Sequence, residues 1–287
     1  LSSAIYAQSV GLVLSGGGAN GIAHVGVIKA LEEYDIPIDY ITGTSSGAFV
    51  GAMYAAGFTP KEMEAFFTSE QFQRMTEGEI EPKDRFFFKE HDDGAGMVKL
   101  RFSKNLSIPL SLPTNFVNPS AVDYQLMQIF AGANAAAKGN FDSLLVPFRC
   151  VAADIDRKEE YVFKNGDLST AVRASFTYPF YLKPIQVDGR VLFDGGLYNN
   201  FPHDQMTDNF NPDFIIGIKV TSNEDPSNED DLLSQIKNML ISKTDFNLKS
   251  DGIIIEPETN HGTFEFKNIQ DIIDSGYAIT VRKIVEI

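Results

Sequence analysis

Apolar runs separated by glycine-rich turns set an alternating order of elements at the start of the chain. Residues 10–14 form an apolar strand, and residues 22–34 carry apolar side chains at helical spacing. Residues 39–42 form a second strand, followed by a small, apolar helix at residues 48–56. The order strand, helix, strand, helix predicts a βαβ unit, and therefore an α/β fold built on a mainly parallel sheet.

The rest of the chain continues this pattern. Gly57 suits the end of one helix, and Thr59-Pro60-Lys61-Glu62 is a capping box with proline at N1 that opens the next. Asp188-Gly189 is a hairpin turn. The pattern predicts helices at 121–137, 168–175, 232–241 and 268–287, and strands at 148–153, 161–163, 185–187, 191–193 and 214–220.

Residues 70–118 interrupt the regular order. This segment is rich in phenylalanine, and its stretches 98–102 and 107–112 alternate in part, as the two strands of a hairpin would. It is interpreted either as a lid or insertion that faces lipid, or as an irregular excursion that packs on the core.

Length and composition narrow the class of protein. The 287 residues, 43% of them hydrophobic, contain no obvious repeat or long linker, so we expect one domain over residues 8–287. The net charge of −15 argues against a nucleic-acid partner and against simple electrostatic adhesion to anionic membranes. The single cysteine, Cys150, lies in an apolar run and is expected to be a buried small hydrophobe.

The two ends of the sequence suggest export and a longer parent chain. Residues 1–7 resemble the end of a signal peptide cleaved after Ala7, although an ordinary frayed terminus is the alternative. No run is long enough to span a bilayer. The predicted C-terminal helix stops without a capping glycine, which suggests a piece of a longer protein. We expect an exported protein, in the periplasm, at the outer membrane or secreted.

A serine motif stands between the second strand and the following helix. Gly43-Thr44-Ser45-Ser46-Gly47 has the form G-x-S-x-G, which holds a serine hydroxyl out on a sharp strand-to-helix turn. The following helix directs its N-terminus at this position, where it favours developing negative charge. The motif indicates a nucleophilic serine.

A glycine-rich loop follows the first strand and opens the first helix, the setting of an anion site. Two interpretations are open. Gly16 to Gly21 contains G-x-G-x-x-G, which with Asp39 as the later acidic residue matches a dinucleotide site. Alternatively, its N–H groups form an oxyanion hole for a tetrahedral acyl intermediate.

A third motif, Asp194-Gly195-Gly196, directly follows a predicted strand. An aspartate at a strand end followed by two glycines can approach another backbone closely. The same residues also suit an ordinary strand-to-loop turn, so local sequence leaves both interpretations open.

Taken in order, these three motifs resemble those of the patatin-like lipid acyl hydrolases. The resemblance runs from about residue 10 to about residue 220, and is closest to the bacterial outer-membrane branch, in which the domain precedes a membrane β-barrel. It implies a three-layer α/β/α fold. It rests on Gly16 to Gly21 with His24 and Gly26 beyond, on the Ser45 pentapeptide, on Asp194-Gly195-Gly196, and on Arg173-Ala174-Ser175 with Pro179.

The resemblance assigns roles to individual residues. Ser45 is the nucleophile, Asp194 its direct partner in a Ser-Asp dyad, and the N–H groups of Gly17, Gly18 and Ala19 are the oxyanion donors. The supporting positions are Gly16, Asn20, Gly21, Gly43, Gly47, Gly195 and Gly196. Asn20 departs from the family pattern, which usually has Arg or Lys there, and the lost charge is expected to weaken anion stabilisation or to change head-group preference, while the backbone donors remain.

The implied function is hydrolysis of fatty-acyl esters of phospholipids or other lipids through an acyl-enzyme, with no cofactor and no metal. The implied partners are the lipid, a membrane surface and an attached outer-membrane barrel. The alternative from another class is a non-catalytic domain of the same fold that binds lipid or protein. Within the enzyme class, a triad of Ser45, Asp194 and either His203 or His261 competes with the dyad. His24 is expected to pack or to form a hydrogen bond.

Overall fold

A mixed sheet of eight strands forms the centre of the computed structural model, which describes residues 8–80, 116–223, 243–259 and 261–287. The strand order is β5-β6-β3-β2-β1-β7-β8, with β4 paired to β3. The pairs among β3, β2, β1, β7 and β8 are parallel, and the pairs that involve β4, β5 and β6 are antiparallel. The strands are β1 (Val10–Leu14), β2 (Tyr40–Thr44), β3 (Phe148–Asp154), β4 (Glu159–Phe163), β5 (Ile185–Val187), β6 (Arg190–Asp194), β7 (Phe214–Ile218) and β8 (Gly252–Ile255).

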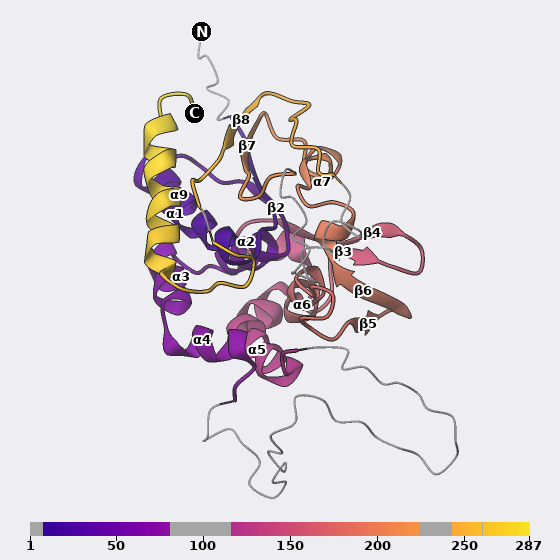
Figure 1. Cartoon of the computed structure of the whole chain (residues 1–287). Coiled ribbons are helices and arrows are strands. Elements are labelled where there is room, and N and C mark those ends of the chain that lie inside the picture. Colours follow the sequence, from indigo (N-terminus) through magenta and orange to yellow (C-terminus); the bar gives the residue numbers. More distant parts are fainter. Residues whose placement is uncertain (1–7, 81–115, 224–242, 260) are drawn as a thin grey trace, which may run out of the picture.

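Helices lie on both faces of this sheet, and Figure 1 shows α1, α2 and α9 on one side of the central strands and α7 on the other. The prediction of an α/β fold with a mainly parallel sheet is confirmed. The helices are α1 (Ala23–Glu33), α2 (Ser46–Ala55), α3 (Pro60–Phe67), α4 (Glu70–Glu77), α5 (Pro119–Ala137), α6 (Leu168–Ser175), α7 (His203–Asn209) and α9 (Ile269–Lys283), with 3₁₀ turns η1 (Gly18–Ile22), η3 (Phe141–Ser143) and η4 (Gly195–Leu197).

Strand β1 shows why the first apolar run is continuous. All five of its residues are buried, because helices cover both faces of the sheet. Leu12 and Leu14 join the larger core on the α1 and α2 side, and Val13 packs with Met206 of α7 on the other. The alternation follows from the pleat, which directs successive side chains to opposite faces.

Local sequence signals set the ends of several helices and turns. The capping box at Thr59 is present, with its side chain accepting from the Glu62 N–H and Glu62 reaching back to the Thr59 N–H. Gly57 closes the preceding helix at a φ of +99°. Both predictions are confirmed, as are the burial of Cys150 and the hairpin around Asp188-Gly189.

Two parts of the sequence prediction need correction. Residues 70–77, assigned to the irregular excursion, form helix α4, which Ser69 caps at its start and Gly78 ends in a left-handed conformation. Strand β8 was not predicted, although its three isoleucines follow a glycine. The predicted hairpin at 98–102 and 107–112, and the predicted helix at 232–241, lie outside the described residues.

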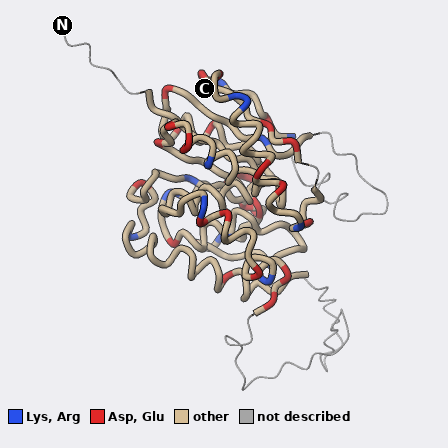
Figure 2. Tube along the Cα trace, turned by 90° about the vertical axis from the view of Figure 1, so that its left-hand side faces the viewer, with Lys and Arg blue, Asp and Glu red and all other residues tan. Residues whose placement is uncertain are grey.

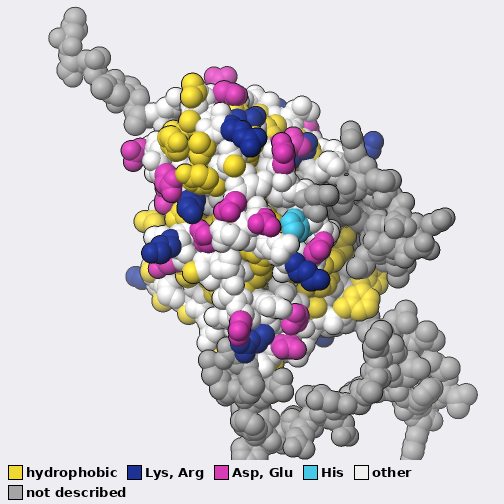
Figure 3. Space-filling model, turned by 60° about the vertical axis from the view of Figure 1, so that its left-hand side comes forward, with side chains coloured by type: hydrophobic (Ala, Val, Ile, Leu, Met, Phe, Trp, Pro, Cys, Tyr) yellow, Lys and Arg dark blue, Asp and Glu magenta, His cyan; other side chains and the backbone are white. Residues whose placement is uncertain are grey.

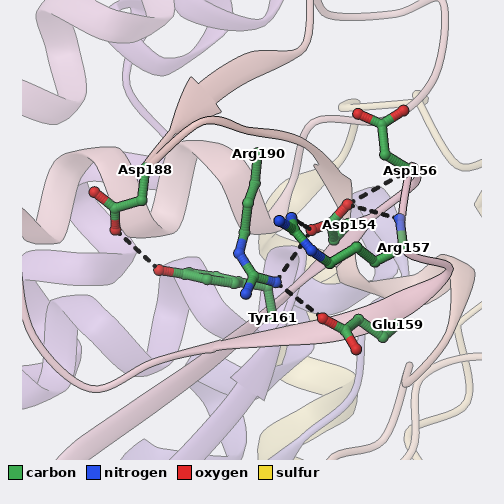
Figure 4. A network of polar contacts seen from close by, with 7 residues as sticks. All are labelled: Asp154, Asp156, Arg157, Glu159, Tyr161, Asp188 and Arg190. Atoms are coloured by element: carbon green, nitrogen blue, oxygen red, sulfur yellow. Dashed lines mark hydrogen bonds and ion pairs between the residues drawn. The ribbon is translucent and has the colours of Figure 1, made fainter.

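A polar network fixes the antiparallel end of the sheet (Figure 4). The Asp154 carboxylate is fully buried, and it accepts hydrogen bonds from the Arg157 guanidinium at 2.8 Å and from the Arg190 guanidinium at 3.1 Å. Arg190 also lies over the Tyr161 ring, with its guanidinium carbon 5.0 Å from the ring centre. Because Arg190 begins β6 and Asp194 ends it, the network holds the strand that carries Asp194 in its register.

Charges of both signs are distributed over the surface, and acidic residues outnumber basic ones (Figure 2). On the face shown in Figure 3, acidic and basic side chains are scattered among apolar ones, and the described residues form no basic patch there. Among the described residues, no helix has the length and apolar character needed to cross a bilayer.

Candidate active site

Ser45 occupies the sharp turn between β2 and α2, as the pentapeptide predicted. Its backbone has φ 55° and ψ −124°, a strained conformation for a residue with a side chain. The turn is possible because Gly43 and Gly47 touch, since a Cβ on Gly43 would lie 2.7 Å from the Gly47 carbonyl oxygen. The Ser45 N–H donates to Ser175 Oγ at 2.9 Å, which in turn donates to the Val151 carbonyl at 2.6 Å.

Asp194 lies directly beside Ser45. In the sheet, Thr44 pairs with Val151 and Asp194 pairs with the next residue, Ala152, so strand β3 brings the two site residues to the same level. Ser45 Oγ donates to Asp194 Oδ2 at 2.6 Å, and the Gly196 N–H donates to Asp194 Oδ1 at 2.8 Å. The arrangement joins the serine to the carboxylate without an intermediate group.

Burial changes the acid strength of Asp194. It raises the pKa of this carboxyl from 3.8 to about 6, although the hydrogen bonds from Ser45 and Gly196 oppose the shift. The carboxylate is therefore a much stronger base than an exposed aspartate, close in strength to an imidazole. Such a shift next to a serine hydroxyl is characteristic of a catalytic group.

The glycine-rich loop follows β1 at the same edge of the sheet. In this conformation the Gly17 N–H donates to Ser46 Oγ at 3.0 Å and the Ala19 N–H donates to the Thr263 carbonyl at 2.9 Å. The described part of the chain provides no acceptor for the Gly18 N–H, and Gly18 has a φ of +57°. Of the three predicted oxyanion donors, Gly18 is thus the one that this conformation leaves available.

The supporting residues also lie around Ser45, at positions where a side chain would collide. A Cβ on Gly16 would lie 2.9 Å from the Ser45 Cβ, one on Gly21 2.0 Å from Ser46 Oγ, and one on Gly195 2.2 Å from the Val151 carbonyl oxygen. The predicted motifs are therefore brought together in space.

No histidine contacts Asp194 in the described part of the chain. His203 lies buried on α7, with Nδ1 3.3 Å from the Phe201 carbonyl and Nε2 without a partner among the described residues. His261 contributes its backbone to the Asn20 side chain. Among the described residues, Ser45 and Asp194 thus lie together without a histidine as third member of a triad.

His24 lies beneath the glycine loop, as a hydrogen-bonding residue. It is fully buried, and its Nε2 lies 2.8 Å from the Ser15 carbonyl oxygen. Burial lowers the pKa of His24 from 6.5 to about 4, although the hydrogen bond to Ser15 opposes the shift. The expectation that His24 has a structural role is confirmed.

The burial of His24 predicts that the folded state loses stability in acid. Because the pKa of His24 is depressed in the folded state, its contribution to stability is full above pH 6.5 and is lost as the pH falls towards 4. We expect the stability advantage of the wild type over His24→Gln to narrow by about 3 kcal/mol between pH 7 and pH 4. Urea unfolding at several pH values measures the gap, and a gap that stays constant with pH contradicts the assignment.

The interpretation of the glycine loop as a dinucleotide site is wrong, because Asp39, the acidic residue that it requires, lies away from the loop. Asp39 precedes β2, at the edge of the sheet opposite the glycine loop, and its carboxylate accepts the Val10 N–H at 2.7 Å. A ribose-binding acid must instead lie at the carboxyl end of the second strand, next to the loop. Asp39 therefore has a structural role.

Two residues support the site in roles that the sequence did not predict. Ser175 holds the backbone of Ser45, and its signal was present in the Arg173-Ala174-Ser175 block. Asn200 accepts the Gly16 N–H with its carbonyl at 3.1 Å and donates its side-chain amide to the Gly16 carbonyl at 3.2 Å. No local pattern marks Asn200.

A cavity of about 580 Å³ opens at Ser45 and Asp194. One part of its wall is aromatic and aliphatic, and another, near the ends of β7 and β8, is polar and includes Lys219 and Glu256. The aromatic part includes Phe49, Phe67, Phe72, Phe176, Tyr178 and Tyr181. Within the described residues, no cluster of three His, Cys, Asp or Glu side chains is suited to hold a metal ion.

The comparisons with known proteins agree on one family. A family described as "Patatin-like phospholipase" matches residues 12–207. "Patatin-like phospholipase domain-containing protein 6" of Mus musculus is 31% identical over 227 residues, which are 78% of this chain and 14% of that protein. "Lysophospholipase NTE1" of Pyricularia oryzae is 30% identical over 227 residues, or 13% of its length. The chain thus spans about one seventh of these relatives.

Among solved structures, VipD from Legionella pneumophila is similar over 98% of this chain and 67% of its own, with a TM-score of 0.49 and 14% identity.

Proposed function

The chain belongs to the patatin-like phospholipase family, and on this basis we propose that it is a lipid acyl hydrolase that uses Ser45 and Asp194. The observation that carries the proposal is the 2.6 Å hydrogen bond from Ser45 Oγ to Asp194 Oδ2 at a cavity with an aromatic and aliphatic wall. The hydroxyl and the carboxylate lie within the hydrogen-bond distance that a nucleophile and its general base require.

In the proposed first step, Ser45 Oγ attacks the ester carbonyl and transfers its proton to Asp194. The pKa of about 6 supports this role, because a buried aspartate of that basicity can do what histidine does in a triad. The strained turn keeps the hydroxyl exposed to the substrate. The carboxylate oxygen accepts the proton, and the new C–O bond forms a tetrahedral intermediate.

The negative oxygen of that intermediate requires donors. The Gly18 N–H is available in the structure, and the N-terminus of α2, which begins at Ser46, adds a favourable dipole. Collapse of the intermediate expels the alcohol, which takes the proton from Asp194. Asp194 then deprotonates a water molecule, which attacks the acyl-enzyme. The second tetrahedral intermediate collapses, Ser45 Oγ leaves and takes the proton back from Asp194, and the fatty acid is released.

The cavity supports a fatty-acyl ester as substrate. Its aromatic wall suits a hydrocarbon chain, and the polar end near Lys219 and Glu256 suits the alcohol or head group. Lys219 is paired with Glu256 at 2.6 Å at this end of the cavity. We propose a glycerolipid, with phospholipids included, reached from a membrane surface.

We also propose that the protein is exported and is attached to an outer-membrane barrel. The resemblance of residues 1–7 to the end of a signal peptide supports export, and the overall similarity of the chain to the outer-membrane branch supports an attached barrel. Fractionation of cells that express the full-length protein, with a periplasmic and a cytoplasmic marker, tests the location. Recovery with the cytoplasmic marker alone contradicts it.

Labelling with a fluorophosphonate probe tests the proposed activity. The probe phosphonylates an activated serine, so we expect one modified peptide, with the label on Ser45. The same preparation is assayed on p-nitrophenyl esters of several chain lengths. A folded protein that takes no label and hydrolyses no ester is a binding domain, and a label elsewhere with Ser45 unmodified overturns the assignment of the nucleophile.

A further inference from the structure

A short segment near the C-terminus lies against the glycine loop. We call residues 261–266 the strap, and five of its residues line the cavity that contains Ser45: His261, Gly262, Thr263, Phe264 and Phe266. The strap is 241 residues from the loop in sequence where the two meet. The described contacts at its two sides are with the loop and with the aromatic wall of the cavity.

Asn20 joins the strap to the loop through both ends of its side-chain amide. Its Nδ2 donates to the His261 carbonyl at 3.0 Å, and its Oδ1 accepts the His261 N–H at 3.3 Å. Such a pair needs one donor and one acceptor on the same planar group, which asparagine provides and a lysine or arginine does not. The structure thus gives Asn20 a specific use in holding the strap.

The backbone of the strap also contacts the glycine loop. The Thr263 carbonyl accepts the Ala19 N–H at 2.9 Å, and a Cβ on Gly18 would lie 2.1 Å from the same oxygen. The position of the strap is therefore fixed relative to the loop that faces the reacting carbonyl.

Aromatic contacts connect the strap to the opposite wall. The Phe264 ring stacks on Tyr181 with 4.1 Å between centres and meets Tyr178 edge-on at 5.2 Å. The Phe266 ring meets Phe72 of α4 edge-on at 5.6 Å. The two phenylalanines thus complete the apolar wall, and their position depends on the strap.

We propose that Asn20 is a positioning residue that sets the acyl-chain preference of the enzyme by holding the strap. The inference rests on the proposed acyl hydrolase function, and it assigns Asn20 to recognition of the acyl chain rather than to the oxyanion. Long chains bury more methylene groups against the wall and therefore depend most on the strap. Short chains use mainly Ser45, Asp194 and the loop.

The test compares p-nitrophenyl decanoate with p-nitrophenyl butyrate in Asn20→Ala. We expect the ratio of kcat/KM for decanoate to that for butyrate to fall about tenfold, the effect of one or two lost hydrogen bonds. The change is expected mainly in KM for decanoate. Phe264→Leu, which leaves Asn20 intact, is expected to lower the same ratio and is available if Asn20→Ala does not fold.

The matched control is Asn134→Ala. Asn134 makes an equivalent two-sided amide contact, accepting the Leu168 N–H and donating to Asp167, both at 2.8 Å, away from the cavity. Its loss is expected to leave the ratio unchanged. Hydrogen exchange of the peptide that contains the strap is expected to be faster in Asn20→Ala than in Asn134→Ala.

The outcomes separate the two proposals. Wild-type protein that hydrolyses neither ester refutes the hydrolase function, and the role of Asn20 with it. Active Asn20→Ala with an unchanged ratio, or with unchanged exchange in the strap, refutes the role of Asn20 alone. A fall in stability with no change in chain preference is the result of a merely structural contact, and also refutes it.

Discussion

Ser45→Ala is expected to lower kcat/KM for acyl-ester hydrolysis by about 10⁴-fold or more, because it removes the only atom that forms the acyl-enzyme. The backbone is expected to tolerate the change. Alanine can adopt the same positive φ as serine, and the Ser45 N–H keeps its bond to Ser175. Steady-state kinetics on a p-nitrophenyl ester measure the loss, and circular dichroism checks the fold.

The control for this variant is Ser143→Ala, which changes an exposed serine in η3. It is expected to keep wild-type activity and to take the fluorophosphonate label. If Ser45→Ala retains more than a small part of the wild-type rate while Ser143→Ala behaves normally, Ser45 is not the nucleophile.

Asp194→Asn is expected to be nearly as inactive as Ser45→Ala, and yet more stable than the wild type above pH 6. The activity is lost because an amide cannot take the proton from Ser45 Oγ. The amide can still accept the Gly196 N–H and donate to Ser45, so both contacts of the carboxylate persist.

The gain in stability follows from the raised pKa of Asp194. Because its folded pKa of about 6 exceeds the unfolded value of 3.8, the contribution of this group is full below pH 3.8 and is lost as the pH rises through 6. At pH 8 the ionised, buried carboxylate costs about 3 kcal/mol, which the amide avoids. Urea unfolding is expected to show a gain of about 2 to 3 kcal/mol at pH 8 that shrinks towards pH 4.

A variant that is inactive but less stable than the wild type at pH 8 contradicts this account, because the carboxylate would then be a net contributor to the fold. A variant that is active contradicts the assignment of Asp194 as the base. The combination of lost activity and gained stability is the mark of a group kept in an unfavourable state for function.

The sequence identified the site residues whose position depends on local structure. Ser45 lies on a turn that five consecutive residues specify. The first two strands and helices follow from the spacing of their apolar residues. Asp194 was found through its two glycines and the resemblance to a family. Its contact with Ser45 depends on the pairing of β3 with both β2 and β6, which spacing along the chain does not encode.

The remaining parts of the site come from distant segments. Asn200 and the strap reach the glycine loop only in the folded chain, and nothing near them in sequence marks that contact. Helix α4 was missed because it is short and mostly polar, with only Phe72 and Met75 buried among its eight residues. Its Ser69 cap and Gly78 end were present as signals.

The pH dependence of kcat/KM is the most direct test of the central claim, that a buried Asp194 is the base for Ser45. This quantity reports the pKa of groups in the free enzyme. We expect one-proton loss of activity on the acid side with a midpoint near pH 6, the pKa of Asp194. A midpoint near 4, or one near 7 that disappears in His203→Gln or His261→Gln, contradicts the claim.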